Sequence, residues 1–360
     1  MNQYCLTEFG CKGTTFLGNF QIFFAKILKY YRASLVGRLI LSTFAPVKPK
    51  ILHISAKSER SCVATIGSFD GVHRGHQRLI SKVLEEARKR DLQSMVITFD
   101  KLPRQLFDAD FKPQLLSTLD EKERLMSELG IDRLVVLPFT TELAALSAQA
   151  FMQQVLNDQL GVKVLVTGYD NRFGHNRSEG FEDYVHYGQE IDMAVIRGDV
   201  ERFKNNGNAV SSSAIRKLLL EGNVTLAAEG LSRYYALTGT VVKGEHIGHK
   251  LGFPTANLSL SDTSKLIPAT GAYAVWATIN GQKMPAMMNI GMRPTFDGHK
   301  QTLEVHIMDD AIGDVYGQQL SVAFVARLRA EQRFDNREAL VTQLEADRTK
   351  TLEILERQKI

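Results

Sequence analysis

Two histidines in a glycine-rich stretch are the residues of this sequence best suited to chemistry. His73 and His76 lie three residues apart around Gly75, within residues 67–77. Two imidazoles with this spacing can face one bound phosphate chain, and a glycine-rich turn that begins a helix favours negative charge through its free N–H groups and the helix dipole. The stretch therefore predicts a site that assists phosphate chemistry by positioning and charge stabilisation, without a protein nucleophile. Its candidate nucleotide-binding residues are Gly67, Phe69, Asp70 and Gly75.

A serine run further along the chain supplies a second set of phosphate ligands. Ser211 and Ser212 begin a predicted helix 135 residues after His76, and Arg216 follows one turn later. Their hydroxyls, the N–H groups of the helix start and the guanidinium can hold a leaving pyrophosphate. The HxGH pattern alone is as well explained by ordinary surface histidines, and a serine run alone by helix capping. The two motifs together indicate a nucleotidyltransferase that activates the α-phosphate of ATP.

A glycine-bounded loop at residues 168–174 is a third candidate. It presents Asp170 and Arg172 directly after a predicted strand, at the edge of the sheet where ligands of α/β proteins bind. The alternative interpretation is a plain surface loop with an ion pair.

The second half of the chain contains a separate glycine-rich region. Thr255 and Asn257 are two residues apart, so in an extended chain they point the same way and offer a hydroxyl and an amide oxygen to one Mg²⁺ ion. A turn-rich corner of a β-barrel explains the same composition. The glycines that allow close backbone approach to phosphates are Gly239, Gly244, Gly248 and Gly252.

Glu304 is a candidate general base. It lies in an alternating strand, on the face opposite Leu303 and Val305, where a carboxylate can deprotonate a hydroxyl. A glutamate on a solvated strand face is the commoner case, and the pattern leaves both open.

The elements that must position these residues have two different periodicities. Before residue 222, short apolar runs at 63–66, 95–99, 134–137 and 164–166 alternate with helical patterns at 76–90, 120–130 and 147–160. Gly130 and Gly161 follow two of these helices as C-terminal caps. This alternation predicts an open, doubly wound α/β sheet of Rossmann-like type.

After residue 230 the apolar period becomes two, with alternating runs at 273–279, 303–307 and 320–324. Turn signals at Asn280-Gly281 and Asp297-Gly298 separate them. We therefore predict a small antiparallel barrel or sandwich, closed by a C-terminal helix that begins with a capping pair, Asp335 and Glu338.

Charge and cysteine content exclude several other classes of protein. Residues 1–50 carry seven Lys/Arg and one acid, so the other 310 residues have a net charge of −2, and the main body has no global basic field for nucleic acid. Basic residues interrupt the apolar stretch 16–45, which argues against a membrane span and indicates an unstructured extension or an over-extended gene start. Three cysteines without metal-site spacing fit a reducing cytoplasm.

From about residue 51 to 350 the sequence resembles the bifunctional prokaryotic riboflavin kinase/FAD synthetase family. The similarity rests on GSFDGVHRGHQ, LSTLDEKERLMSELGID, VTGYDNRFG, SSSAIR, LGFPTAN, MNIGMRPTFDG and LEVHIMD, in this order. The family's pattern is altered at Ser68, Asn171, Ser213 and His249, and Leu102 stands where the family's Glu-Pro-His-Pro segment has histidine.

The resemblance implies two Mg²⁺-dependent reactions: ATP phosphorylates riboflavin to FMN in the β domain, and ATP adenylylates FMN to FAD in the α/β domain. It also implies that His73 and His76 stabilise the adenylyl-transfer transition state, that Ser211, Ser212 and Arg216 hold the triphosphate, and that Asp170 lies by the nucleotide. In the kinase, Thr255 and Asn257 would ligate magnesium and Glu304 would be the general base.

We accordingly expect a basic extension at 1–50, an FMN adenylyltransferase domain at 51–228 and a riboflavin kinase domain at 229–360. The expected partners are flavins and ATP, with no nucleic acid, no membrane and weak self-association at most. Three alternatives remain open: a different phosphate acceptor such as a nicotinamide or pantetheine phosphate, a barrel that binds nucleic acid or protein, and a chain in which only the kinase is active.

Overall fold

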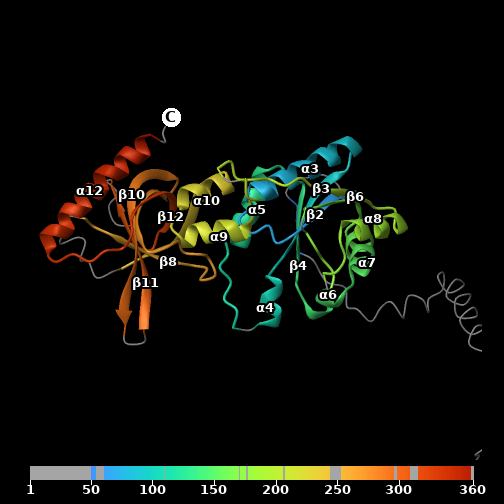
Figure 1. The fold of residues 1–360 in the computed structure, drawn as a ribbon, viewed down its shortest axis with the longest axis horizontal. Coiled ribbons are helices and arrows are strands. Elements are labelled where there is room, and N and C mark those ends of the chain that lie inside the picture. Colours follow the sequence, from blue (N-terminus) through green and yellow to red (C-terminus); the bar gives the residue numbers. More distant parts are fainter. Residues whose placement is uncertain are drawn as a thin grey trace, which may run out of the picture. The chain divides into compact units, whose positions relative to one another are not determined.

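The computed structural model describes residues 50–53, 61–108, 110–169, 171–175, 177–205, 207–243, 253–295, 298–308 and 315–357. Residues Lys48–Ile360 form one compact unit (Figure 1). Asp170, Gly244, Gly248 and Gly252, which the sequence singles out, and the extension 1–49 lie outside the described residues.

The first part of the chain forms a six-stranded sheet with the order β1-β4-β3-β2-β5-β6. Five strands are parallel, as the alternating pattern predicts: β2 (Cys62–Ile66), β3 (Gln93–Phe99), β4 (Arg133–Leu137), β5 (Val162–Thr167) and β6 (Ala194–Arg197). The pattern did not predict β6 or the edge strand β1 (Lys50–His53), which pairs antiparallel with β4. Strand order reverses between β2 and β5, so the crevice beyond their carboxyl ends is the expected ligand site.

Helices connect these strands: α3 (Arg74–Arg90), α4 (Pro103–Phe107), α5 (Leu119–Glu128), α6 (Thr141–Ala145), α7 (Ala148–Phe151) and α8 (Phe181–Glu190). Gly130 and Gly161 have φ of +80° and +67°, which confirms their predicted place at helix ends. The helix predicted at 147–160 is correct in position but not in type, because α7 continues as a π-helix over Met152–Gln159.

Two short helices, α9 (Ser212–Leu220) and α10 (Val224–Leu231), precede a closed barrel with the order β10-β11-β8-β7-β12-β9. Its strands are β7 (Tyr235–Val242), β8 (Ala256–Leu260), β9 (Gly271–Ile279), β10 (Gln282–Thr295), β11 (Gly298–Ile307) and β12 (Gln319–Arg329). Asn280 and Gly281 have φ of +50° and +81° and form the predicted turn between β9 and β10. This barrel confirms the antiparallel β half.

The C-terminal helix α12 (Arg337–Glu356) begins one residue later than the sequence pattern predicts. Its N-cap is Asn336, whose side-chain oxygen accepts a hydrogen bond from the Ala339 N–H at 2.8 Å. The predicted capping pair of Asp335 and Glu338 was therefore wrong: Asn336 caps the helix, and Ala339 three residues later has no side-chain acceptor to complete a capping box.

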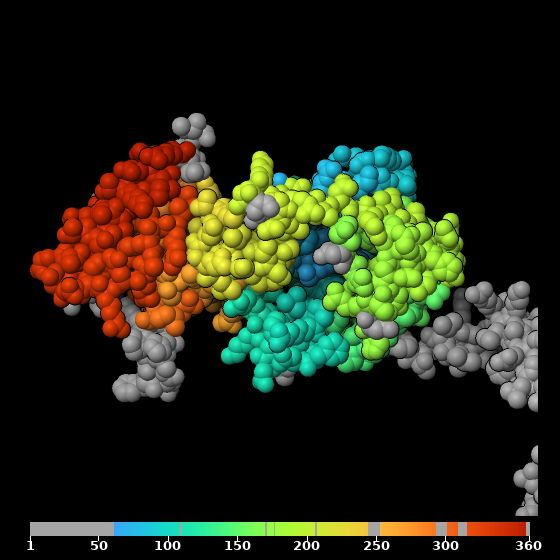
Figure 2. Space-filling view, in the orientation of Figure 1, coloured from blue at the N-terminus to red at the C-terminus, as the bar shows by residue number. Residues whose placement is uncertain are grey.

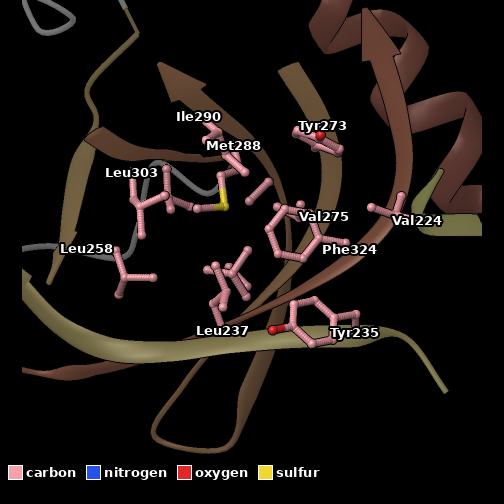
Figure 3. Packing of buried hydrophobic residues seen from close by; sticks show 14 of the residues in the cluster. Val224, Tyr235, Leu237, Leu258, Tyr273, Val275, Met288, Ile290, Leu303 and Phe324 are labelled. Atoms are coloured by element: carbon pink, nitrogen blue, oxygen red, sulfur yellow. The ribbon is translucent and has the colours of Figure 1, made fainter. Parts of the chain in front are cut away.

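One hydrophobic cluster fills the barrel and continues into the helices before it. Strand residues such as Leu237, Val275 and Phe324 pack together inside the barrel, and Figure 3 shows Val224 of α10 beside them. The same cluster contains Ile215 and Leu219 of α9. Apolar packing therefore crosses the domain boundary predicted at residue 228.

Candidate functional site

The turn between β2 and α3, residues 67–73, has an unusual backbone conformation. Phe69 and Val72 have φ of +47° and +40°, and Gly71 between them has φ of +79°. A positive φ at a bulky residue costs of order 1–3 kcal/mol. Both side chains are buried in the core of the sheet domain, which holds the residues in place. Burial of these side chains therefore holds the backbone of the turn in one defined conformation.

The turn brings the two histidines into contact. His73 is the N-cap of α3, and its Nδ1 accepts a hydrogen bond from the His76 N–H at 3.3 Å. The rings stack with their centroids 3.6 Å apart, and the Phe69 ring meets His76 edge-on. Gly75 leaves room for this approach, since a Cβ there would make tight contacts, 3.0 Å from the Val210 carbonyl and 3.1 Å from the His73 ring.

Both imidazoles are neutral at physiological pH. Burial lowers the pKa of His73 to about 4, with Asp70 opposing the shift and Arg233 and Arg216 adding to it. Burial also lowers the pKa of His76 well below its ordinary value, helped by His73. Because Nδ1 of His73 accepts a hydrogen bond, its proton is on Nε2, and the neutral ring is a hydrogen-bond donor at that atom.

Asp70 joins the turn to two other segments. Its buried carboxylate accepts hydrogen bonds from the Leu116 N–H at 2.9 Å and the Ser117 N–H at 3.0 Å, and it pairs with Arg216 at 2.5 Å. Arg216 also donates from Nε to the Gln114 carbonyl at 2.8 Å. Protein groups thus occupy the Asp70 carboxylate, which fits a residue that supports the turn.

The structure brings the serine run to this same turn. Ser211 is the N-cap of α9 and accepts a hydrogen bond from the Ala214 N–H, while Ser212 donates from Oγ to the Asp70 carbonyl at 2.8 Å. Residues far apart in the sequence therefore meet, with the N-terminus of α9 next to that of α3. The space-filling view shows the blue start of the described chain at the base of a hollow bordered by later segments (Figure 2).

A cavity of about 460 Å³ opens beside the turn, beyond the carboxyl ends of the central strands. Gly67 and Ser68 form part of its wall, and Leu102 and Asn171, two of the departures from the family's pattern, also line it. Asn171 donates from its side chain to the Ile66 carbonyl at 2.7 Å. The remaining wall contains five phenylalanines, aliphatic side chains such as Leu143 and Leu146, and two arginines; the phenylalanines and arginines are Phe99, Phe107, Phe139, Phe151, Phe173, Arg172 and Arg177.

The sequence interpretation missed Lys122, a buried lysine of α5 behind the turn. Its side chain donates to the Ser68 carbonyl at 2.8 Å and to the Thr98 hydroxyl at 3.2 Å. Burial lowers the pKa of Lys122 to about 8, with Asp70 partly opposing the shift. A usable signal existed, because Lys122 is three and four residues before the buried Leu125 and Met126 and therefore shares their helix face.

The barrel carries the second predicted set of residues on its outer face. Glu304 of β11 is directly opposite Asn257 of β8 and Asn289 of β10. Opposed residues of an antiparallel pair share a face, with Cβ atoms about 5 Å apart. Leu303 and Val305 are buried while Glu304 is partly exposed, so the structure confirms the predicted strand parity. Pairing also adds Asn289, which the sequence could not connect with Glu304.

Two other predicted residues of the barrel, Thr255 and Gly239, lie in different surroundings: Thr255 directly before β8 and Gly239 within β7. Thr255 precedes β8, and it and Asn257 are partly exposed on either side of the buried Ala256, as expected for side chains on one face. Gly239 of β7 lies against β8, and a Cβ there would collide with the Ser259 carbonyl. The close approach at Gly239 is thus to a neighbouring strand.

Comparisons with known proteins give the class of this chain. A family model described as FAD synthetase matches residues 55–214, and one described as riboflavin kinase matches residues 231–355. A sheet domain of the first kind followed by a barrel of the second defines a two-domain flavin-nucleotide enzyme. The relatives named bifunctional riboflavin kinase/FMN adenylyltransferase include one from Escherichia coli strain K12, 39% identical over 298 residues, and one from Pseudomonas fluorescens, 38% identical over 297. Each match covers 82% of this chain and 94% of the relative, and the chain belongs to this bifunctional family.

A solved structure has the same arrangement. A crystal structure from Streptococcus pneumoniae, titled as a macrolide-efflux protein, has a TM-score of 0.75 and 34% identity, and the match covers 82% of this chain and 95% of that one. Among the residues described here, no helix has the length and apolar character needed to cross a membrane.

Proposed function

We propose that this chain makes FAD from riboflavin in two steps, first phosphorylating riboflavin to FMN and then transferring AMP from ATP to FMN. The observation that carries the proposal is the meeting of the stacked histidines, the start of α9 and an aromatic cavity at one edge of the sheet. Family membership supports both activities.

In the adenylyl transfer, an FMN phosphate oxygen attacks the α-phosphorus of ATP. A new phosphoanhydride bond forms, the bond to the bridging α,β-oxygen breaks, and pyrophosphate leaves with that electron pair. Neutral His73 and His76 donate hydrogen bonds to the α-phosphate as charge develops on it. Ser211 through its hydroxyl, Ser212 through its backbone N–H and Arg216 hold the leaving pyrophosphate, which requires Arg216 to share its guanidinium between Asp70 and phosphate.

The remaining predicted residues of this domain either lie next to the nucleotide or support the β2–α3 turn. Gly67 and Gly75 allow close approach of the backbone to the nucleotide, and Asp170 contacts the nucleotide from the loop after β5. Phe69 and Asp70 shape the turn, since the first packs against His76 and the second binds segment 116–117.

The aromatic cavity receives the flavin ring of FMN. A flat, largely apolar ring system is complementary to walls formed by phenylalanines, and Arg172 and Arg177 can meet the FMN phosphate. Leu102 then contributes an apolar contact where the family has histidine.

In the kinase, Glu304 takes a proton from the riboflavin 5′-hydroxyl, whose oxygen attacks the γ-phosphorus of ATP and displaces ADP. Thr255 and Asn257 would hold Mg²⁺, and the glycines at 244, 248 and 252 would line the phosphate path, whereas Gly239 packs against β8. The donor set fits this ion, because Mg²⁺ takes hard oxygen ligands and keeps sites for water and substrate phosphate. When bound, magnesium neutralises charge on the phosphates.

The proposal is tested by incubating the purified chain with riboflavin, ATP and Mg²⁺ and separating the flavins by chromatography over time. FMN is expected to appear before FAD. FMN without FAD would leave only the kinase, and absence of both products from folded protein would overturn the assignment.

The same assay tests the cavity through Ala144→Phe, because Ala144 lines the cavity and a phenyl group there reduces the space for a flavin ring. This variant is expected to raise the KM for FMN and slow FAD formation, with riboflavin phosphorylation unchanged. An unchanged KM for FMN would place the flavin elsewhere.

Lys122 provides the pH dependence of the adenylyl transfer. A buried ammonium behind the turn stabilises phosphate charge, and this stabilisation is lost when the group deprotonates above pH of about 8. The kcat/KM for ATP, which reports the free enzyme, should therefore fall as pH rises through 8. Lys122→Arg, which stays charged, should move this fall to higher pH, whereas the exposed control Lys89→Arg should not. A pH profile unaffected by Lys122→Arg would contradict the role.

We propose the cytoplasm as the compartment, ATP and flavins as the ligands, and at most weak self-association. The net charge of −2 outside residues 1–50 and the small number of cysteines support this proposal. Salt-sensitive retention of the chain on immobilised RNA would contradict the expectation that the chain does not bind nucleic acid.

A further inference from the structure

We propose that Arg233, although it lies in the segment that matches the riboflavin kinase model, is a positioning residue for adenylyl transfer. This inference rests on the proposed function of the β2–α3 turn. According to this inference, a residue of the riboflavin kinase half holds the adenylyl-transfer turn in position.

The first support is direct contact between Arg233 and the turn. Arg233 donates to the Gly71 carbonyl at 2.7 Å and to the Val72 carbonyl at 3.5 Å, and it also donates to its neighbour Leu231 at 3.1 Å. Gly71 and Val72 immediately precede His73, and both have positive φ. The guanidinium therefore binds the two carbonyls whose orientation the unusual backbone determines.

Gln77 of α3 completes this contact. Its side-chain amide donates to the Val72 carbonyl at 2.9 Å and to the Leu231 carbonyl at 3.1 Å, and its oxygen accepts from the Ser232 hydroxyl at 2.8 Å. The last residues before the barrel are thus hydrogen-bonded to both sides of the histidine pair.

A second connection reaches the turn through segment 115–117. Leu115 forms two backbone hydrogen bonds with the barrel, from its N–H to the Ser264 carbonyl at 2.7 Å and from the Leu266 N–H to its carbonyl at 2.9 Å. Lys265 donates to the Leu116 carbonyl at 2.8 Å and pairs with Glu121. This segment holds Asp70 of the turn through its own N–H groups. Barrel residues thus fix the turn from two directions.

These contacts have a functional consequence because catalysis by positioning is sensitive to small displacements. A shift of about 1 Å in a reacting group can cost about a hundredfold in rate. The strained φ values of Phe69 and Val72 need outside support to persist. Without Arg233, the turn can relax and move the imidazoles away from the α-phosphate.

The test compares Arg233→Met and Arg233→Lys with Arg327→Met. Arg327 is a matched control, because it also binds backbone carbonyls, those of Thr270 at 2.6 Å and Glu221 at 3.4 Å, and these carbonyls lie outside the turn. For Arg233→Met we expect the kcat of FAD formation from supplied FMN to fall about tenfold or more, with the KM for ATP nearly unchanged and riboflavin phosphorylation intact. Arg233→Lys should recover part of the loss, and Arg327→Met should leave both reactions at the wild-type rate.

Wild-type kcat in Arg233→Met, or an equal loss of both reactions, would overturn the inference. Hydrogen exchange separates this failure from failure of the proposed function, because it needs no substrate: amides of residues 69–76 should exchange faster in Arg233→Met than in the wild type. If the wild type makes no FAD, the proposed function fails on its own. If Arg233→Met does not fold, Lys265→Met tests the second connection with the same measurements, and wild-type kcat and exchange there would overturn the inference.

Discussion

Replacing His76 with asparagine is expected to lower the rate of FAD formation from FMN and ATP by about a thousandfold, in line with loss of a charge-stabilising donor in a preorganised site. The variant also removes the ring that stacks on His73 at 3.6 Å, so the remaining imidazole loses a contact that holds it in position. The measurement is the initial rate of pyrophosphate release with FMN supplied directly.

Two controls make the result specific. Riboflavin phosphorylation by His76→Asn should keep the wild-type rate, because the barrel carries that reaction. His186→Asn changes an exposed histidine of α8 that faces Glu190 and should alter neither reaction. If His76→Asn retained more than a tenth of the adenylyl-transfer rate, the histidine pair would not be the centre of the chemistry.

Replacing Glu304 with glutamine should produce the reciprocal result. Loss of a general base costs roughly a hundredfold to ten-thousandfold, and we expect riboflavin phosphorylation to fall within that range. Glutamine has nearly the same shape and can still hydrogen-bond, so the KM for riboflavin should change little. The measurement is the rate of FMN appearance from riboflavin and ATP.

The matched control is Glu331→Gln, an exposed carboxylate near β10 that accepts a long hydrogen bond from the Met292 N–H. It should phosphorylate riboflavin at the wild-type rate, and Glu304→Gln should still convert supplied FMN to FAD. Near-normal phosphorylation by Glu304→Gln would remove the carboxylate from the proposed role.

Local patterns predicted those parts of the molecule that local physics determines. The apolar runs gave the parallel strands β2–β5, and the period of two placed Glu304 opposite Leu303 and Val305. The expected meeting of the histidine-bearing turn with the serine run is also observed, as a hydrogen bond from Ser212 to Asp70, because motifs after strand ends collect at one edge of a sheet.

Features set by distant contacts could not be predicted in this way. The sequence predicted Asp70 as a ligand-binding residue. Only the fold shows that its carboxylate is bound to Leu116 and Arg216. In the sequence, nothing distinguishes Arg233 from other arginines that precede a strand. Its contact with the turn is seen only in the fold. The antiparallel edge strand β1 likewise depends on a partner, β4, that lies about eighty residues away.

The hydrophobic cluster that runs from the barrel into α9 and α10 bears on how the molecule folds and how it can be divided. Ile215, Leu219 and Val224 belong to a cluster most of whose members are barrel residues synthesised later, so these helices lack most of their apolar partners until the barrel has formed. A break at residue 228 would expose that surface on the N-terminal fragment and invite aggregation. We therefore expect single substitutions to separate the two chemical steps, while the polypeptide that performs them unfolds as one cooperative unit.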